Sequence, residues 1–204
     1  MINLYNLDCL PAMREMPDKA YELAIVDPPY GIGAGEGVGC TRGVGVTQYV
    51  KKQWDSNKPE RYYFDCLRRV SQNQIICGGN YFADMLPASR GWVYWRKEMG
   101  GNYADGELIW TSFDQNLKEY TKRSESLNRI HPTQKPVALY KWLLINYAKP
   151  GDRILDTHGG SGSICIACDI LGFDLDWYEI DADYFQAAKE RLERHQRQQV
   201  LDLK

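Results

Sequence analysis

Apolar residues along this chain gather in short runs, and most runs end at Gly, Pro, Asn or Asp, as buried strands commonly do. The runs predict strands near residues 2–6, 23–27, 73–77, 92–96, 108–112, 153–156 and 175–179. Apolar positions at helical spacing predict helices near residues 59–70, 136–147, 163–171 and 182–198. This alternation of strands and helices indicates an α/β fold with a doubly wound, mostly parallel sheet.

Two strands depart from the alternation, because residues 92–96 and 108–112 follow each other with no predicted helix between them. We therefore expect them to pair antiparallel, as a hairpin at one edge of a seven-stranded sheet. The chain has 204 residues, of which 44% are hydrophobic, and this is enough to bury one sheet between helices. A single domain over residues 1–204 is expected, with residues 31–60 and 114–130 as loop insertions.

The first of these insertions is rich in glycine, with seven glycines between residues 31 and 45. Such a segment is too flexible for a core. We interpret residues 31–48 as a loop that orders over a substrate, although a disordered insertion fits the same composition.

The net charge of −2 and the pI near 6.0 exclude a protein that holds nucleic acid by bulk electrostatics. Residues 90–141 are the exception, with nine Lys and Arg against six Asp and Glu. Their basic residues could face phosphates or simply form a solvated face: Arg96, Lys97, Lys118, Lys122, Arg123 and Arg129. The six cysteines are expected to be reduced thiols, and the Cys165 and Cys168 pair is expected to belong to a helix rather than to a metal site.

Residues 27–30 (DPPY) follow the apolar run 23–26 and place a carboxylate, two prolines and an aromatic ring at the end of a predicted strand. Because proline has no N–H and a fixed φ, the backbone here stays extended and its carbonyls stay free. Asp27 and the Pro28 carbonyl could together accept both hydrogens of an exocyclic amino group. A planar heterocycle could stack on Tyr30, which is worth about 1–3 kcal/mol in single-strand nucleic-acid sites. Taken alone, the segment also fits a Pro-rich turn.

A second motif lies near the other end, where the strand predicted at 153–156 runs into residues 157–163 (THGGSGS) and then a helix. Glycines allow the backbone to approach a ligand and to turn sharply into the helix. Glu179 follows about twenty residues later, at the spacing of an acid that binds ribose hydroxyls. The loop is not Gly-x-Gly-x-x-Gly and has no Walker lysine, which favours a nucleotide cofactor without phosphates.

With residues 131–136 (HPTQKP) between them, the two motifs resemble the DNA amino-methyltransferases over nearly the whole chain. These enzymes move a methyl group from S-adenosylmethionine to adenine N6 or cytosine N4. The order, with DPPY first and the Gly-rich loop last, resembles the circularly permuted β group, and residues 74–82 and 91–97 are similar to segments of its compact phage and prophage members. One departure is that Thr157 and His158 replace the usual Pro-Phe.

The resemblance implies a Rossmann-like class I methyltransferase fold in which the first strand lies beside the last one. It implies a catalytic segment formed by Asp27, Pro28, Pro29 and Tyr30, and no metal. It also implies a set of cofactor-binding residues, namely Asp8, His131, Thr133, Lys135, Asp156, Thr157, Gly159, Gly160, Ser161, Gly162 and Glu179. For Asp8, a solvated turn is the alternative interpretation.

The implied activity is that of a site-specific adenine-N6 DNA methyltransferase acting on a base flipped out of double-stranded DNA. A carboxylate is too weak a base to deprotonate an aryl amine, so Asp27 is expected to orient the amino group. Asp rather than Ser at position 27 favours adenine by resemblance. Cytosine N4, an RNA adenine, a protein glutamine amide and a DNA-binding protein without catalysis are the alternatives.

Sequence specificity could come from residues 31–60, from residues 114–130 or from a second subunit in a homodimer. The start of the chain does not have the pattern of a secretory signal, and no apolar run reaches membrane-spanning length. We therefore expect a protein of the cytoplasm, in a bacterial cell or a phage-infected host, with no membrane partner.

Overall fold

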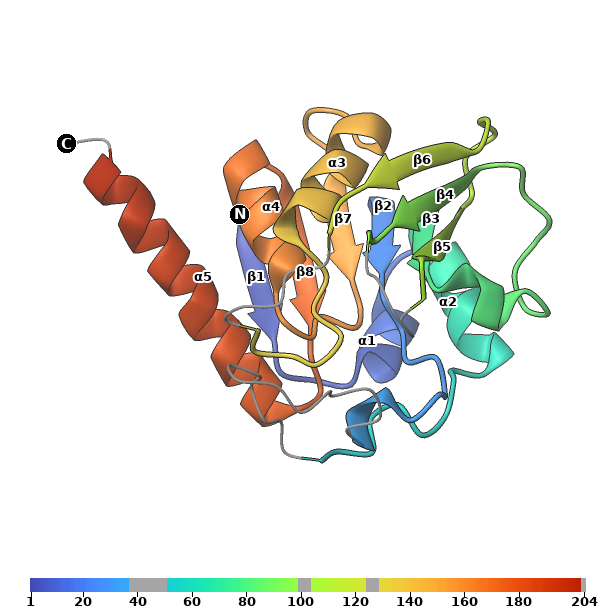
Figure 1. Ribbon diagram of the computed structural model, residues 1–204, viewed down its shortest axis with the longest axis horizontal. Helices are drawn as coiled ribbons and strands as arrows, with labels where there is room; N and C mark the ends of the chain where they lie inside the picture. Colours follow the sequence, from blue (N-terminus) through green and yellow to red (C-terminus); the bar gives the residue numbers. More distant parts are fainter. Residues whose placement is uncertain (37–50, 99–103, 124–128, 203–204) are drawn as a thin grey trace.

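The computed structural model describes residues 1–36, 51–98, 104–123 and 129–202, and its strands form one eight-stranded sheet (Figure 1). The sheet order is β1-β8-β7-β2-β3-β5-β4-β6. In chain order the strands are β1 (Ile2–Tyr5), β2 (Tyr21–Val26), β3 (Ser71–Cys77), β4 (Trp92–Arg96), β5 (Gly106–Thr111), β6 (Lys118–Thr121), β7 (Arg153–Asp156) and β8 (Asp174–Tyr178). The α/β class and the mostly parallel sheet are confirmed.

Helices cover both faces of the sheet (Figure 1). They are α1 (Cys9–Glu15), α2 (Arg61–Val70), α3 (Val137–Tyr147), α4 (Ser163–Leu171) and α5 (Ala182–Asp202), with the 3-10 turns η1 (Ala34–Glu36) and η2 (Gly79–Phe82). The four helices that were predicted are all present. Helix α1 was not predicted, because its seven residues include Pro11 and are too short for a helical pattern to stand out.

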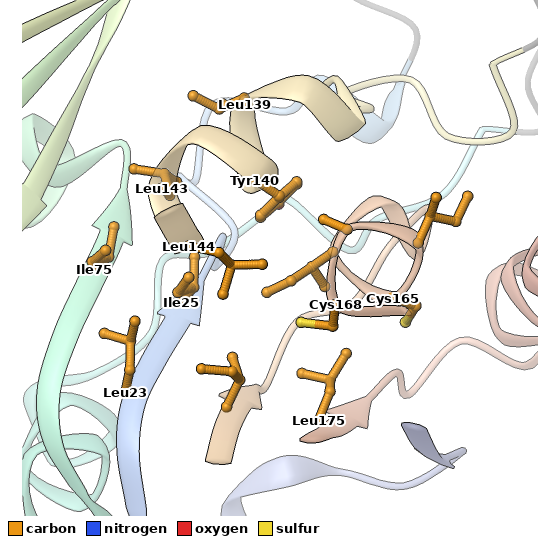
Figure 2. Packing of buried hydrophobic residues seen from close by; sticks show 14 of the residues in the cluster. Leu23, Ile25, Ile75, Leu139, Tyr140, Leu143, Leu144, Cys165, Cys168 and Leu175 are labelled. Atoms are coloured by element: carbon orange, nitrogen blue, oxygen red, sulfur yellow. The ribbon is translucent and has the colours of Figure 1, made fainter. Parts of the chain in front are cut away.

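Alternation along the central strand β2 divides the core into two layers. Leu23 and Ile25 point into a cluster with α3, α4 and α5, whereas Ala24 and Val26 point into a second cluster with α1 and α2. Figure 2 shows the first cluster, where Leu143 and Leu144 of α3 lie on the side of Ile25 and the two cysteines of α4 lie on the side of Leu175. Strand β2 is thus packed on both faces, as strands at the centre of a parallel sheet commonly are, and Asp27 follows directly at its end.

The predicted hairpin is present, since β4 and β5 pair antiparallel with Trp92 opposite Trp110. It does not form the edge of the sheet, however. Strand β6 pairs parallel to β4, with Val93 opposite Lys118, so the sheet has eight strands rather than the seven expected. Strand β6 has the short, polar sequence Lys-Glu-Tyr-Thr, which suits a partly solvated edge strand. It was not predicted because it has no clear apolar run. Residues 114–130 are therefore not entirely loop.

The first strand lies beside the last, as expected, because β1 pairs parallel to β8 with Leu4 opposite Trp177. Strands β8, β7, β2 and β3 continue in parallel from there. Their carboxyl ends consequently meet at one edge of the sheet, which is where ligands bind in open α/β sheets.

The cysteines behave as expected where the structure describes them. Five of them are free and buried, namely Cys9, Cys66, Cys77, Cys165 and Cys168. Cys40 and most of the glycine-rich residues 31–48 lie outside the described residues. Within the described part of the chain, no helix combines the length and the apolar character that crossing a membrane would need.

Candidate active site

A cavity of about 250 Å³ opens at the carboxyl ends of β1, β2, β7 and β8. Eleven of the fifteen residues predicted for the site line it: Asp8, Asp27, Pro29, His131, Thr133, Lys135, Thr157, Gly159, Gly160, Ser161 and Glu179. The remaining four, Pro28, Tyr30, Asp156 and Gly162, lie next to lining residues along the chain but outside the lining itself. The cavity therefore brings together the two motifs, which are more than 120 residues apart in the sequence.

The glycine-rich loop lies flat against β8. The Gly159 N–H donates to the Tyr178 carbonyl at 2.8 Å, and a Cβ on Gly159 would lie 1.8 Å from the Trp177 ring. Only glycine fits at this position. Gly160 and Gly162 have left-handed φ angles of +51° and +65°, which turn the chain into α4.

Glu179 joins this loop to the end of β8. Its Oε2 accepts the Gly160 N–H at 2.7 Å and its Oε1 accepts the Asp181 N–H at 2.8 Å. Burial raises the pKa of Glu179 above its usual range. A carboxylate offers about four lone-pair sites, so the two oxygens can still accept hydroxyl groups from the cavity.

The side chains of Asp8 and Asp156 each accept a hydrogen bond from a backbone N–H two residues later, at the wall of the cavity. Asp8 caps α1, accepting the Leu10 N–H at 2.9 Å, and it also lines the cavity. Asp156 is buried beneath the loop, where its Oδ1 accepts the His158 N–H at 3.0 Å. Burial raises the pKa of Asp156 well above its ordinary value. The structure thus places Asp156 under the cavity wall rather than in the lining.

Thr157 and His158, the residues that depart from the family pattern, are held by Tyr63 of α2. The Tyr63 hydroxyl and Thr157 Oγ1 are 2.7 Å apart, and Thr157 Oγ1 is 3.0 Å from Nδ1 of His158. Burial lowers the pKa of His158 to about 4, so this imidazole is neutral at pH 7. The polar pair is therefore accommodated by hydrogen bonds within the wall.

Asp27 lies directly after β2, and both of its oxygens are engaged. Oδ1 accepts the Tyr30 hydroxyl at 2.7 Å and Oδ2 accepts the Lys135 ammonium at 2.5 Å. Lys135 is 3% exposed and also lies 3.3 Å from Glu107 of β5. Lys97 of the chain after β4 pairs with the other oxygen of Glu107. Two carboxylates thus face two ammonium groups.

The charges in this cluster stabilise one another. Burial lowers the pKa of Lys135, but the charges of Asp27 and Glu107 outweigh it and the pKa is raised overall. Burial likewise raises the pKa of Glu107, and the nearby Lys135 and Lys97 reverse this and lower it. Both groups are therefore charged at neutral pH. Lys135, predicted to contact the cofactor, lines the cavity but directs its ammonium to Asp27.

Tyr30 packs against the turn that follows β3. Its ring stacks on Tyr81, with centroids 4.7 Å apart and an interplanar angle of 15°. Gly78 lies so close that a Cβ there would be 2.3 Å from the Tyr30 ring. One face of Tyr30 is therefore already covered in this structure.

His131 forms the opposite wall together with two aromatic residues that were not predicted. Its ring contacts Tyr184 of α5 and Trp54, with centroids 4.3 Å and 4.8 Å away. Nδ1 lies 3.1 Å from Thr133 Oγ1. Burial and the nearby Lys135 lower the pKa of His131 to about 3, so the ring is neutral.

Several lining residues were not found from the sequence: Leu7, Cys9, Trp54, Gln134, Tyr140, His158, Ile180 and Tyr184. Leu7 and Ile180 adjoin Asp8 and Glu179, so their position next to the predicted acids is a signal that could have found them. Trp54 lies in a segment without local pattern. Only the folded chain brings it to His131.

The sheet has the α/β methyltransferase fold. The structure of the M1.HpyAVI complex with SAM superposes with a TM-score of 0.66 at 20% identity, covering 94% of this chain and 99% of that one. The PvuII DNA methyltransferase (cytosine-N4-specific) superposes with a TM-score of 0.64 at 12% identity, covering 95% and 90%. Both similarities confirm the fold.

Sequence comparison identifies the family. A family model described as DNA methylase matches residues 89–190, and the chain belongs to this family of N6-adenine and N4-cytosine DNA methylases. A relative from Escherichia coli strain K12, named "Putative methylase YubD", is 25% identical over 205 residues, which are 93% of this chain and 89% of that protein. The protein is thus an S-adenosylmethionine-dependent DNA methyltransferase.

The cavity fits this cofactor. The backbone of Gly159 and Gly160 lines the cavity directly, and the loop offers no lysine for a phosphate. Glu179 and Asp8 place carboxylate oxygens in the lining, and such acceptors suit the hydroxyl and amino groups of a nucleoside. The apolar side chains of Leu7 and Ile180 lie beside those acceptors on the same wall and suit a flat ring.

Proposed function

We propose that this protein methylates the N6 amino group of an adenine flipped out of double-stranded DNA, with Asp27 as the acceptor that orients the amino group. The observation that carries the proposal is the position of Asp27, which lines the same cavity as Glu179 and Asp8. The choice of adenine rests on the resemblance of DPPY to adenine-specific members. Membership of the family does not by itself select adenine, because the family also includes N4-cytosine enzymes.

The residues of the catalytic segment have separate roles in this proposal. Asp27 and the Pro28 carbonyl accept the two amino hydrogens and direct the nitrogen lone pair toward the cofactor side of the cavity. Pro28 and Pro29 keep the segment extended, because their φ angles are fixed. Tyr30 fixes Asp27 through its hydroxyl, and its ring is the group proposed to stack on the base.

Lys135 orients the Asp27 carboxylate through its ammonium group, and Glu107 holds that ammonium from the other side. With Lys135 on one oxygen, the remaining lone pairs of Asp27 can accept the amino group, as a carboxylate has about four acceptor sites. When bound, S-adenosylmethionine supplies an electrophilic methyl group. Much of the acceleration then comes from alignment, an effect that can reach about 7–11 kcal/mol. The proton leaves after the nitrogen has become cationic, next to the Asp27 carboxylate.

Cofactor binding is assigned to the loop and to the ends of β8 and β1. Glu179 is proposed to bind the ribose and Asp8 the adenine amino group, while Thr157, Gly159, Gly160 and Ser161 line the space for the remainder of the cofactor. His131 and Thr133 close the other side. Asp156 and Gly162 support this wall from outside the lining.

The proposal is tested by incubating the purified protein with methyl-labelled S-adenosylmethionine and unmethylated duplex DNA, followed by nucleoside digestion and mass spectrometry. Labelled N6-methyladenine is expected. Labelled N4-methylcytosine would keep the mechanism and overturn the choice of base. Unlabelled DNA from a protein that binds the cofactor in calorimetry would point to an RNA or a protein glutamine as the acceptor.

A further inference from the structure

The carboxylate of Asp55 lies beside the chain that follows the catalytic segment, and it is 2% exposed. Its Oδ1 accepts the N–H groups of Tyr30 at 2.6 Å and Gly31 at 2.9 Å. Its Oδ2 accepts those of Ile32 at 3.3 Å and Ala34 at 2.8 Å. Four backbone donors around one carboxylate form a nest, the concave arrangement of amides that binds anions in proteins. Here the anion is a side chain of the same protein.

The other backbone N–H groups of residues 28–34 are also accounted for by Asp55 or by proline. Pro28 and Pro29 have no N–H to offer. The Gly33 N–H donates to the backbone carbonyl of Asp55 at 3.1 Å. Every backbone N–H from residue 28 to residue 34 is thus bonded to this one residue. Left-handed φ angles of +72° at Gly31 and +73° at Gly33 allow the amides to turn inward.

Asp55 is itself anchored from the opposite wall of the cavity. The neighbouring Trp54 packs on His131, and Lys52 forms ion pairs with Asp181 at 2.6 Å and Asp183 at 2.7 Å. These contacts do not involve the catalytic segment. The segment formed by residues 52–55 therefore provides a fixed point from which Asp55 holds the loop.

We propose that Asp55 is a positioning residue for methyl transfer. By holding the Tyr30 backbone, it keeps the Tyr30 hydroxyl 2.7 Å from Oδ1 of Asp27. Asp55 thereby sets the orientation of the carboxylate that receives the amino group, without touching the reacting atoms. The part of the inference that concerns transfer rests on the proposed function; the hold on the loop does not.

The first test compares Asp55→Asn with wild type by amide hydrogen exchange. The amide keeps the size of the side chain but presents an NH₂ to two backbone donors. We expect the amides of residues 30–34 to exchange at least about tenfold faster in this variant. Asp65→Asn, the same change at an exposed ion pair with Arg68 on α2, is the matched control and should leave them unchanged. Unchanged exchange in Asp55→Asn would overturn the inference.

The second test measures turnover per cofactor-binding site, counted by calorimetric titration, with unmethylated duplex DNA. We expect kcat of Asp55→Asn to fall about 10- to 100-fold, because small misplacements of reacting groups have effects of this size. The Kd for S-adenosylmethionine and the KM for DNA should change by less than about threefold. A merely structural role would lower the number of binding sites and leave kcat per site unchanged, and that result would overturn the role in transfer.

The two tests also separate this inference from the proposed function. If the wild-type protein methylates no DNA, the proposed function and the role of Asp55 in transfer both fail. The exchange measurement would still decide whether Asp55 holds the loop, because it needs neither DNA nor turnover.

Discussion

The ammonium of Lys135 lies 2.5 Å from Oδ2 of Asp27, although 108 residues separate the two in the sequence. This contact connects the segment predicted for the cofactor with the segment predicted for the target base. It makes the acceptor carboxylate part of a charge cluster around the buried Lys135, which also contains the half-buried Glu107 and Lys97. The first two predictions concern this pair.

Replacing Asp27 by Ala should remove the acceptor and leave the cofactor wall intact. We expect turnover to fall by at least about 100- to 1,000-fold, the range seen when one group that stabilises a transition state is lost. The Kd for S-adenosylmethionine, measured by calorimetry, should stay within a few-fold of wild type. Asp27→Asn keeps one accepting oxygen and should retain more activity than Asp27→Ala. An alanine variant with wild-type turnover would contradict the role of Asp27.

Replacing Lys135 by Met should leave Asp27 and Glu107 with one ammonium group in place of two. Breaking a buried ion pair destabilises a protein by about 3–5 kcal/mol, which denaturant unfolding would measure. We also expect kcat to fall more than cofactor affinity, since the ammonium contacts the acceptor carboxylate. Lys135→Arg retains the charge and should lose less. A variant with weakened cofactor binding and normal kcat would instead place Lys135 with the cofactor.

His131 should make stability depend on pH in the mildly acidic range. Its pKa is about 3 in the folded protein, against an ordinary value of 6.5, so below pH 6.5 the unfolded chain binds more protons. The folded state should therefore lose stability as the pH falls, by about 2 kcal/mol from this residue between neutral pH and pH 5. Comparing His131→Gln with wild type by thermal unfolding from pH 7 to pH 5 isolates this contribution. Parallel curves for the two proteins would contradict it.

Gly159→Ala should displace the glycine-rich loop, because the new Cβ would lie 1.8 Å from the Trp177 ring. We expect a loss of about 1–3 kcal/mol in stability from overpacking and at least a tenfold weaker Kd for S-adenosylmethionine. Gly151→Ala is a suitable control. Gly151 has a φ of +91° with nothing near its Cβ position, so the variant should lose stability from backbone strain while cofactor affinity stays unchanged.

The sequence predicts the central sheet well because its strands carry unbroken apolar runs and end at recognisable polar residues. Strand β2 followed by Asp27, and β7 followed by the glycine-rich loop, are examples. Strand β6 carries too few apolar residues for such a signal. Its position depends on parallel pairing with β4, and the residues of β6 alone give no signal for that pairing.

The residues that line the cavity were predicted in outline, but the contacts between them were not. Asp8 was placed by the family resemblance and Glu179 by its spacing from the glycine-rich loop, and both line the cavity. Glu107 and Asp55 could not be placed from the sequence, since each acts on residues far away in sequence, and their neighbours give no periodic signal. The direction of the Lys135 side chain likewise depends on buried charge rather than on the motif that contains it.

The pairing of β1 with β8 has a consequence for how the protein is made. Leu4 of β1 and Trp177 of β8 are partners in this pair. Strand β1 is made early in synthesis, but it can join the sheet only after β8 has been made. Contacts this distant in sequence slow folding, because a large loop has to close before they form. The acid-bearing wall around Asp8 and Glu179 is therefore expected to assemble last during synthesis, after the ribosome has released the strand that leads to Glu179. Until then the nascent chain contains the DPPY segment, but the wall proposed to bind the methyl donor has not formed.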